Sequence, residues 1–158
     1  MLEIERSVLL IMKRLFVVIL FLTLSLSVIA QRDVYKAFAE KFERREGYDV
    51  STIGRVALKA ALVAADSKSR EMLRNVDYVV TIINHNPQNG ALKSELGRVV
   101  AGYSKVFERS VEEGSATAYL NGNGSGLVFF ITTPKEQIAL LIEGKNFNYE
   151  DFLPDELK

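Results

Sequence analysis

The clearest pattern in the sequence is an alternation of apolar and other positions within residues 115–145. Leu127, Phe129 and Ile131 occupy every second position of one run, and the alternation recurs in residues 138–142. A period of two is typical of β-strands, because successive side chains point to opposite faces of a sheet. Turn residues rich in Gly, Asn and Pro separate the runs. The stretch therefore predicts three strands joined by tight turns, an antiparallel meander.

Upstream of the meander, the spacing of apolar residues predicts three helices and one further strand. The helices are expected at residues 33–45, 53–65 and 91–110, the strand at residues 76–85, an extended lead-in at residues 48–52, a loop with one helical turn at residues 66–75, and a closing turn or short helix at residues 147–152. The helix at residues 91–110 has the strongest signal, because its apolar residues follow one helical face without a gap. The helix at residues 53–65 is apolar nearly all round, which favours burial.

Together these elements predict an α+β domain. We expect an antiparallel sheet of about four strands, one strand and then the three-strand meander, with helices packed mainly on one face. Two helices, each about 10 Å wide, roughly cover four strands spaced about 4.8 Å apart. The helix at residues 33–45, with Val34, Phe38 and Phe42 on one stripe, then either caps an end of the sheet or covers its second face.

The second face of the predicted sheet is the candidate interaction face. We expect Val80 and Ile82 to face the helices together with the Leu127 and Ile138 sets. The reverse side then carries Val79, Ile83, Tyr119, Val128, Phe130 and Leu141. If the helix at residues 33–45 does not cover that side, a partly apolar patch stays open, and such patches mark partner surfaces. The sequence favours neither arrangement over the other.

Residues 1–30 have the three parts of a secretory signal peptide. A basic pair follows Met12, a candidate natural start, and precedes an uncharged apolar run that ends in small Ala30 before Gln31. We expect cleavage between Ala30 and Gln31, which would leave residues 31–158 as a single α+β domain, periplasmic or secreted. The alternative is a membrane anchor, but a spanning helix needs about 20 apolar residues and this run is shorter.

Composition narrows the chemistry that the chain can perform. Its 20 basic and 20 acidic residues balance, so no net charge attracts it to nucleic acid or to an anionic membrane. Cysteine is absent, which excludes disulfides, thiolate metal sites, a Cys nucleophile and a lipid-modified Cys. With a single His, a metal site of several His would need a second chain. We therefore expect no cofactor, no nucleic-acid partner, no lipid anchor and no stable membrane span after cleavage.

Three further motifs have chemical potential, and each has a simpler explanation. His85 ends a strand among amide side chains without a Ser/Asp motif or a second His, so we interpret it as a polar turn residue. Residues 121–125 are glycine-rich like a phosphate loop, but they join two strands and lack Lys, which favours a flexible hairpin. The acid pairs at 112–113 and 150–151 could in principle hydrolyse a glycosidic bond, but neighbouring acids usually point apart. We assign no catalytic or metal-binding residue.

The elements also follow one another in a recognisable order. Behind a leader that ends in Ala30-Gln31 come an amphipathic helix, an apolar helix, a strand, a long helix, the meander, and an aromatic and acidic segment after Glu143-Gly144. This order resembles the secreted bacterial family called domain of unknown function 4252, over about residues 35–152. The resemblance implies an exported α+β domain of the Gram-negative envelope without an established activity. Many members carry a lipobox Cys where this chain has Gln31, so their lipid anchor does not carry over.

The sequence favours an exported, non-enzymatic binding or assembly module that acts through a sheet face. Its partner would be another envelope protein or a second copy of the chain. The alternative is a small periplasmic hydrolase that uses acidic residues, and an accessory role in envelope stress or signalling is a third hypothesis. A module should show a flat apolar patch or a dimer across the sheet, whereas an enzyme should show a cleft where polar side chains converge.

Overall fold

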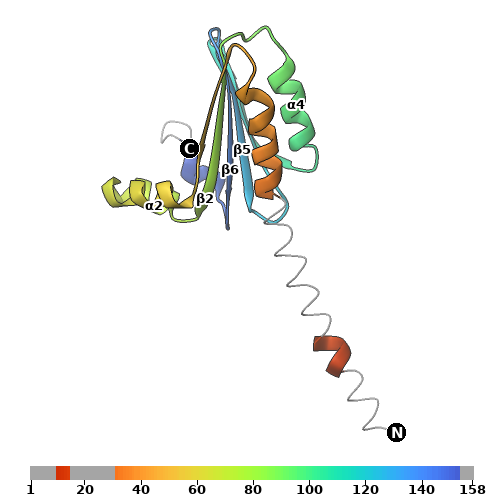
Figure 1. Ribbon diagram of the computed structural model, residues 1–158, viewed down its shortest axis with the longest axis vertical. Coiled ribbons are helices and arrows are strands. Elements are labelled where there is room, and N and C mark those ends of the chain that lie inside the picture. The colour runs from red at the N-terminus through yellow and green to blue at the C-terminus, as the bar shows by residue number, and fades with distance from the viewer. Residues whose placement is uncertain (1–9, 15–30, 154–158) are drawn as a thin grey trace.

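The computed structural model describes residues 10–14 and 31–153 of the chain. Its centre is an antiparallel sheet of six strands in the order β1-β2-β6-β5-β4-β3. The strands are β1 (Tyr48–Ile53), β2 (Val76–Asn84), β3 (Ser104–Val111), β4 (Gly114–Leu120), β5 (Gly126–Thr132) and β6 (Gln137–Gly144). The helices are α2 (Arg55–Ala64), α3 (Ser67–Leu73), α4 (Ala91–Val99), the 3-10 helix η1 (Tyr149–Phe152), and helical segments at residues 10–14 and 31–43. Helix 31–43 and α4 lie on one face of the sheet, and α2 projects from the other (Figure 1).

Gln31 begins the second described part of the chain. The predicted signal peptide lies outside the described residues, apart from the helical residues 10–14, and so does the predicted cleavage residue Ala30. Gln31 is the first described residue of helix 31–43. None of the helices in the described part of the chain combines the length and the apolar character needed to cross a bilayer.

The α+β class is confirmed, but the expected sheet of about four strands is wrong, because the sheet has six. The strand expected at residues 76–85 and the three-strand meander are present as β2 and β4 to β6. The two additional strands, β1 and β3, are the edges of the sheet. In β1 the extended lead-in pairs along its whole length with β2, from Tyr48 opposite Asn84 to Ile53 opposite Val79. Its mixed polar sequence hides this pairing, because an edge strand needs few apolar side chains.

Strand β3 replaces the second half of the helix expected at residues 91–110. Helix α4 ends at Val99, and residues 104–111 pair with β4 instead. The pairing has a bulge between Lys105 and Phe107, and both Val106 and Phe107 pack against the same hydrophobic cluster. A bulge inserts one residue and breaks the period-two pattern. The two adjacent apolar residues therefore fit a helical spacing although they belong to a strand.

The sheet has two faces of different character. The helix face carries Val80, Ile82, Val128, Phe130, Ala139 and Leu141, which form one cluster with helix 31–43 and α4. The reverse face carries Val79, Ile83, Leu127, Phe129, Ile131, Ile138, Leu140 and Ile142, which the strand register places on the opposite side. The predicted helix-facing set mixed these two faces, because Val80 pairs with Leu141 and Val79 with Ile142. Alternation fixes the faces within one strand, and only the register relates one strand to the next.

Helix 31–43 lies on the helix face beside α4, so both arrangements expected for it, a cap at one end of the sheet and a cover over the second face, are wrong. Its buried stripe is Tyr35, Phe38, Ala39 and Phe42, at the i, i+3, i+4 and i+7 positions of one helical face. Val34, expected in this stripe, is exposed instead. Each large side chain buried here contributes about 1.5–3 kcal/mol before entropy is subtracted. Two helices on one side therefore supply the main core and leave the other side without an equivalent layer.

Candidate interaction surface

The reverse face divides into a covered half and an open half. Over the covered half, Leu58 of α2 and Leu153 at the end of the described chain join Leu127, Phe129 and Ile142 in a hydrophobic cluster. The ring of Phe152 in η1 lies 6.4 Å from that of Phe129, centroid to centroid. Asn148 caps the start of η1, because its side chain accepts a hydrogen bond from the backbone amide of Glu150. The C-terminal segment thus takes the place of a covering helix, over part of the face.

The open half contains a row of apolar residues that cross the sheet in register. Ile83 of β2 lies opposite Ile138 of β6, which lies opposite Ile131 of β5, and Ala116 of β4 follows. Neither hydrophobic cluster of the described residues includes the three isoleucines. They lie at the strand ends away from the start of α2. We call Ile83, Ile131, Ile138 and Ala116 the open row.

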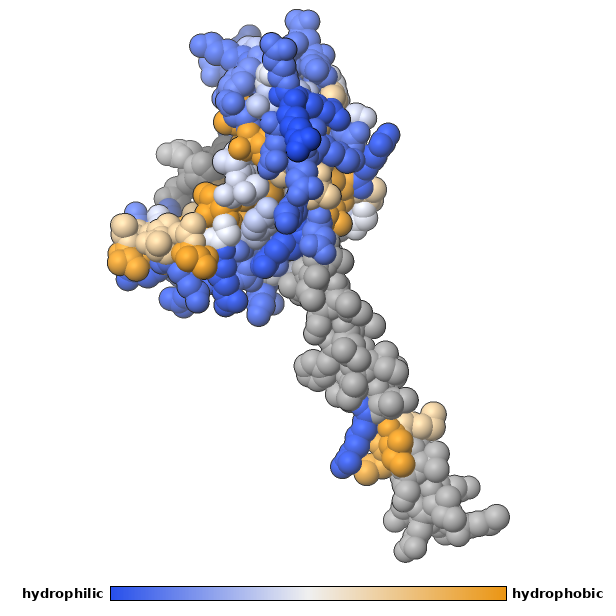
Figure 2. Space-filling view, in the orientation of Figure 1, coloured by the Kyte–Doolittle hydropathy of each residue, from blue (hydrophilic) through white to orange (hydrophobic). Residues whose placement is uncertain are grey.

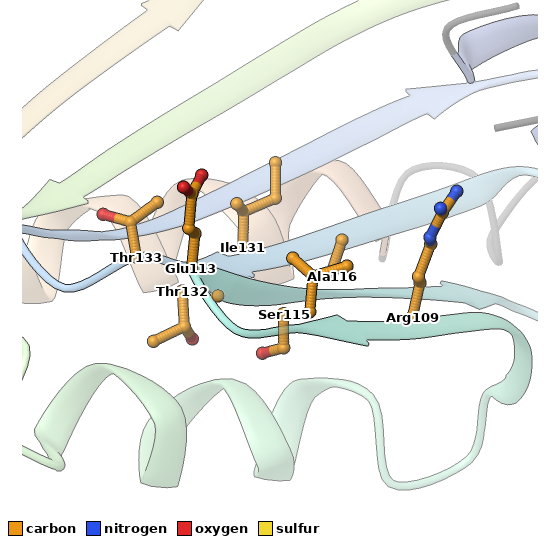
Figure 3. Close-up of a pocket in the computed structure, with 9 residues that line it drawn as sticks. Arg109, Glu113, Ser115, Ala116, Ile131, Thr132 and Thr133 are labelled. Carbon is orange, nitrogen blue, oxygen red and sulfur yellow. The ribbon is translucent and has the colours of Figure 1, made fainter. Parts of the chain in front are cut away.

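A shallow hollow of about 330 Å³ lies at the β3–β4 end of the open row. In Figure 3, Ile131 and Ala116 point to the same side of the sheet as Arg109 and Glu113, which stand at opposite ends of the hollow. Ser115 and Thr132 point to the other side, toward α4. Val111, another lining residue, is 56% exposed. An apolar floor between two charged ends suits contact with another surface more than it suits catalysis.

Helix α2 is the second exposed apolar feature. Only Leu58 of its ten residues is buried, whereas Val56 and Val63 are 85% and 84% exposed. Figure 2 shows apolar residues gathered over this projecting helix. The burial expected for the apolar helix at residues 53–65 is therefore wrong. The Arg70 guanidinium donates to the backbone oxygens of Leu62 and Ala65, which satisfies carbonyls at the C-terminal end of the helix.

The six residues predicted as one interaction face do not lie on one surface. Val79 and Ile83 are on the reverse face. Tyr119, Val128, Phe130 and Leu141 are on the helix face, where Val128 and Leu141 are fully buried. Sequence reasoning missed Val111 and α2 as exposed apolar features, and Ile131 and Ile138 as half-buried residues of the open row. The alternation of Ile131 and Ile138 was visible, but the side on which helix 31–43 packs was not.

His85 lies at the rim of the open half between two carboxylates. Its Nε2 is 2.6 Å from Oδ2 of Asp49, and its Nδ1 is 3.9 Å from Oε2 of Glu136. All three side chains lie at least partly in solvent. The cluster is an exposed cross-strand contact that becomes a full ion pair when the imidazole is protonated. Within the described residues, no group of three or more His, Asp and Glu is placed to hold a metal ion.

The glycine-rich turn at residues 121–125 uses its polar groups internally. Oδ1 of Asn121 accepts hydrogen bonds from the amides of Ser125 and Gly126. Nδ2 of Asn121 donates to Oε1 of Gln31, which joins the turn to the start of helix 31–43. Gly124 has a φ of +69°, a conformation that favours glycine. The turn is therefore a structural hairpin that also positions the first helix.

The two acid pairs lie in different parts of the fold. Glu112 and Glu113 are exposed in the β3–β4 turn beside the open half. Glu150 and Asp151 are exposed in η1, the segment over the covered half. The structure does not bring these two pairs together into one site.

A buried acid that the sequence reasoning missed lies below helix 31–43. Glu143 is fully buried, and its carboxylate accepts three hydrogen bonds from the guanidinium of Arg32, 2.9, 3.0 and 3.3 Å long. Burial raises the pKa of the Glu143 carboxyl, and the Arg32 guanidinium opposes this rise. Nearby, the hydroxyls of Tyr35 and Tyr103 are 2.9 Å apart, and burial raises the pKa of both phenols. The alternation along β6 could have predicted this burial, because it places Glu143 on the same face of the sheet as Ala139 and Leu141.

This polar cluster fixes the start of helix 31–43 on the sheet. Nε2 of Gln31 donates to the Tyr103 hydroxyl, while Arg32 binds Glu143. These contacts begin at the first described residue of the helix.

No family model matches the sequence, and no curated protein or solved structure matches it either.

Proposed function

We propose that the protein is an exported, non-enzymatic binding module that acts through the open half of its reverse face and through helix α2, which projects from the same face. The observation that carries this proposal is the exposure of apolar side chains on both features, Val111 beside the open row and Val56 and Val63 on α2. Exposed apolar patches on proteins mark interaction sites, and here two of them lie at opposite strand ends of the sheet. The hollow beside Ile131 adds shape to the patch.

Export is the second part of the proposal, to the periplasm or the medium. The leader has the pattern of a signal peptide, and the resemblance to the domain of unknown function 4252 family agrees with an envelope protein. We expect the cut between Ala30 and Gln31, where a small residue ends the uncharged apolar run.

Site-specific photocrosslinking tests the binding surface. The full-length chain is expressed with its own leader, with a photoreactive phenylalanine analogue in place of Val111 or Val63. The matched control is Val34, an exposed valine on helix 31–43 that is 45% exposed. We expect adducts of defined mass from Val111 and Val63 and none from Val34. No adduct at either site, or equal labelling at all three, would contradict the proposal.

The same preparation tests export. We expect the chain in the periplasmic or extracellular fraction, with an amino-terminal sequence that begins at Gln31. A chain that keeps its leader and sediments with membranes would support the anchor hypothesis instead.

A further inference from the structure

We propose that the partner of this surface is a second copy of the chain, in a two-fold dimer in which α2 of each copy covers the open row of the other. The inference rests on the proposed binding function and names its occupant. It starts from a mismatch inside one molecule. The sheet has an apolar half without a covering helix, and α2 is an apolar helix without a sheet beneath most of its surface.

The position of α2 makes a reciprocal contact geometrically simple. Helix α2 follows the Ile53 end of β1, lies beside β2, and projects outward from the reverse face (Figure 1). The open row lies at the opposite strand ends. A two-fold axis that runs across the strands, parallel to the sheet, places β2 over β2 and exchanges the two strand ends. It therefore brings α2 of one copy over Ile83 and Ile138 of the other, twice.

Charge favours the same arrangement. Helix α2 carries Lys59 and Arg55 and no acidic residue, and Arg55 pairs with Asp77 of its own chain at 3.5 Å. The rim around Ile83 and Ile138 carries the carboxylates of Asp49 and Glu136, with the imidazole of His85 between them. Opposite charges that approach across an interface steer association and fix its register. Each copy supplies one basic helix and one acidic rim, so the two contacts of a two-fold dimer are both complementary.

The size of the contact fits a weak but specific dimer. A ten-residue helix is about 15 Å long and about 10 Å wide. When it packs on a sheet, it removes on the order of 300 Å² of accessible surface from each side. The reciprocal contact has four such surfaces, on the order of 1,200 Å² in total, the lower end of the range for specific interfaces. We therefore expect association in about the micromolar range.

Because the chain has no cysteine, engineered thiols give a clean test. A Val63→Cys chain and an Ile138→Cys chain are each expressed at full length with the leader, purified, mixed and oxidised. We expect a disulfide-linked dimer in the mixture. The matched control, Val34→Cys mixed with Ile138→Cys, should give none. Crosslinking of Val63→Cys with itself alone, or equal yields in both mixtures, would overturn the reciprocal arrangement.

A charge exchange tests the orientation without a crosslink. Lys59→Glu and Glu136→Lys should each weaken the dimer about tenfold or more, measured by light scattering after size exclusion over a dilution series. The chain that carries both changes should recover most of the affinity, since the two charges are exchanged at both contacts. Two additive losses, or no loss from either change, would contradict the predicted pairing.

Failure of the dimer can be told apart from failure of the proposed function. If the chain is monomeric at about 100 µM while Val111 and Val63 photocrosslink a different protein, the surface binds a foreign partner and this inference is wrong. If the chain is monomeric and neither position gives an adduct, both proposals fail. Recruitment of the monomer to phosphatidylglycerol vesicles through α2 would likewise reject the dimer.

Discussion

At the scale of single residues, the most consequential contact is the ion pair of Arg32 and Glu143. The carboxylate is fully buried while the Arg32 side chain is 46% exposed, so the pair is only partly screened by water. Removing the cation leaves a buried charge without its partner, which costs about 3–5 kcal/mol in a dry interior. Exposure of the guanidinium reduces this figure. Arg32→Met should therefore lower the free energy of unfolding by about 2 kcal/mol.

The loss of unfolding free energy in Arg32→Met should be larger at high pH than at low pH. Burial raises the pKa of Glu143 above its ordinary value, so the stability linked to this group is complete below the unfolded pKa and is lost as pH rises through the folded pKa. Loss of Arg32 raises the folded pKa further. In urea unfolding, Arg32→Met should thus lose more stability at pH 7 than at pH 4. Glu143→Gln in the same background should remove this pH dependence, and an unchanged dependence would mean that another group causes it.

Gly144 offers a second test of residue-level packing. A Cβ at this position would collide with the backbone oxygen of Asn75 and the ring of Phe147. Backbone atoms cannot move aside as a flexible side chain can, so Gly144→Ala should destabilise the fold by about 1–3 kcal/mol. Thermal unfolding measures the loss. A variant as stable as the parent would show that β6 and the Asn75 segment are not closely packed.

At the scale of elements, Gly97 should respond in the opposite way. It lies within α4, and a Cβ there would meet nothing within 4 Å. Alanine has a higher helix propensity than glycine and restricts the unfolded chain. Gly97→Ala should therefore stabilise the fold by about 0.5–1 kcal/mol in urea unfolding. A loss of stability would indicate that this turn of α4 is not helical in solution.

The elements also show what could be predicted from the sequence. Strands β2, β5 and β6 could be predicted, because their apolar residues alternate or run continuously and each has a buried face. Strand β3 could not, since its bulge sets Val106 beside Phe107 in a helix-like spacing. The candidate surface was only partly predictable: Ile83 was placed on the reverse face, but Tyr119 and Phe130 were not separated from it. Register between strands depends on tertiary pairing that the local pattern does not contain.

Helix α2 also shows what a local sequence pattern does not contain. Its apolar sequence favours burial, and the chain itself buries only Leu58. A local pattern indicates that a surface should be covered without stating which molecule covers it. If a partner covers it, polar substitutions on α2 should affect association and leave the fold intact. Val63→Glu should therefore unfold within about 0.5 kcal/mol of the parent chain in dilute solution.

At the scale of the whole molecule, the distribution of helices links stability to concentration. Helix 31–43 and α4 cover one face of the sheet, whereas the reverse face depends on a C-terminal segment, a single leucine of α2 and, in our proposal, a second copy. A partner that binds only the folded chain stabilises it by mass action. A monomer would unfold at a temperature that does not depend on its concentration.

The dimer therefore predicts a thermal midpoint that rises with protein concentration. At 100 times the dissociation constant, linkage of this kind is worth about 2.7 kcal/mol, which corresponds to several degrees for a domain of this size. The Val63→Glu chain should show the parent midpoint at high dilution and no rise on concentration, because its α2 can no longer pack on an apolar row. Val34→Glu, a matched change on helix 31–43, should keep the rise. A concentration-independent midpoint in the parent chain would show that its folded state does not depend on a second copy.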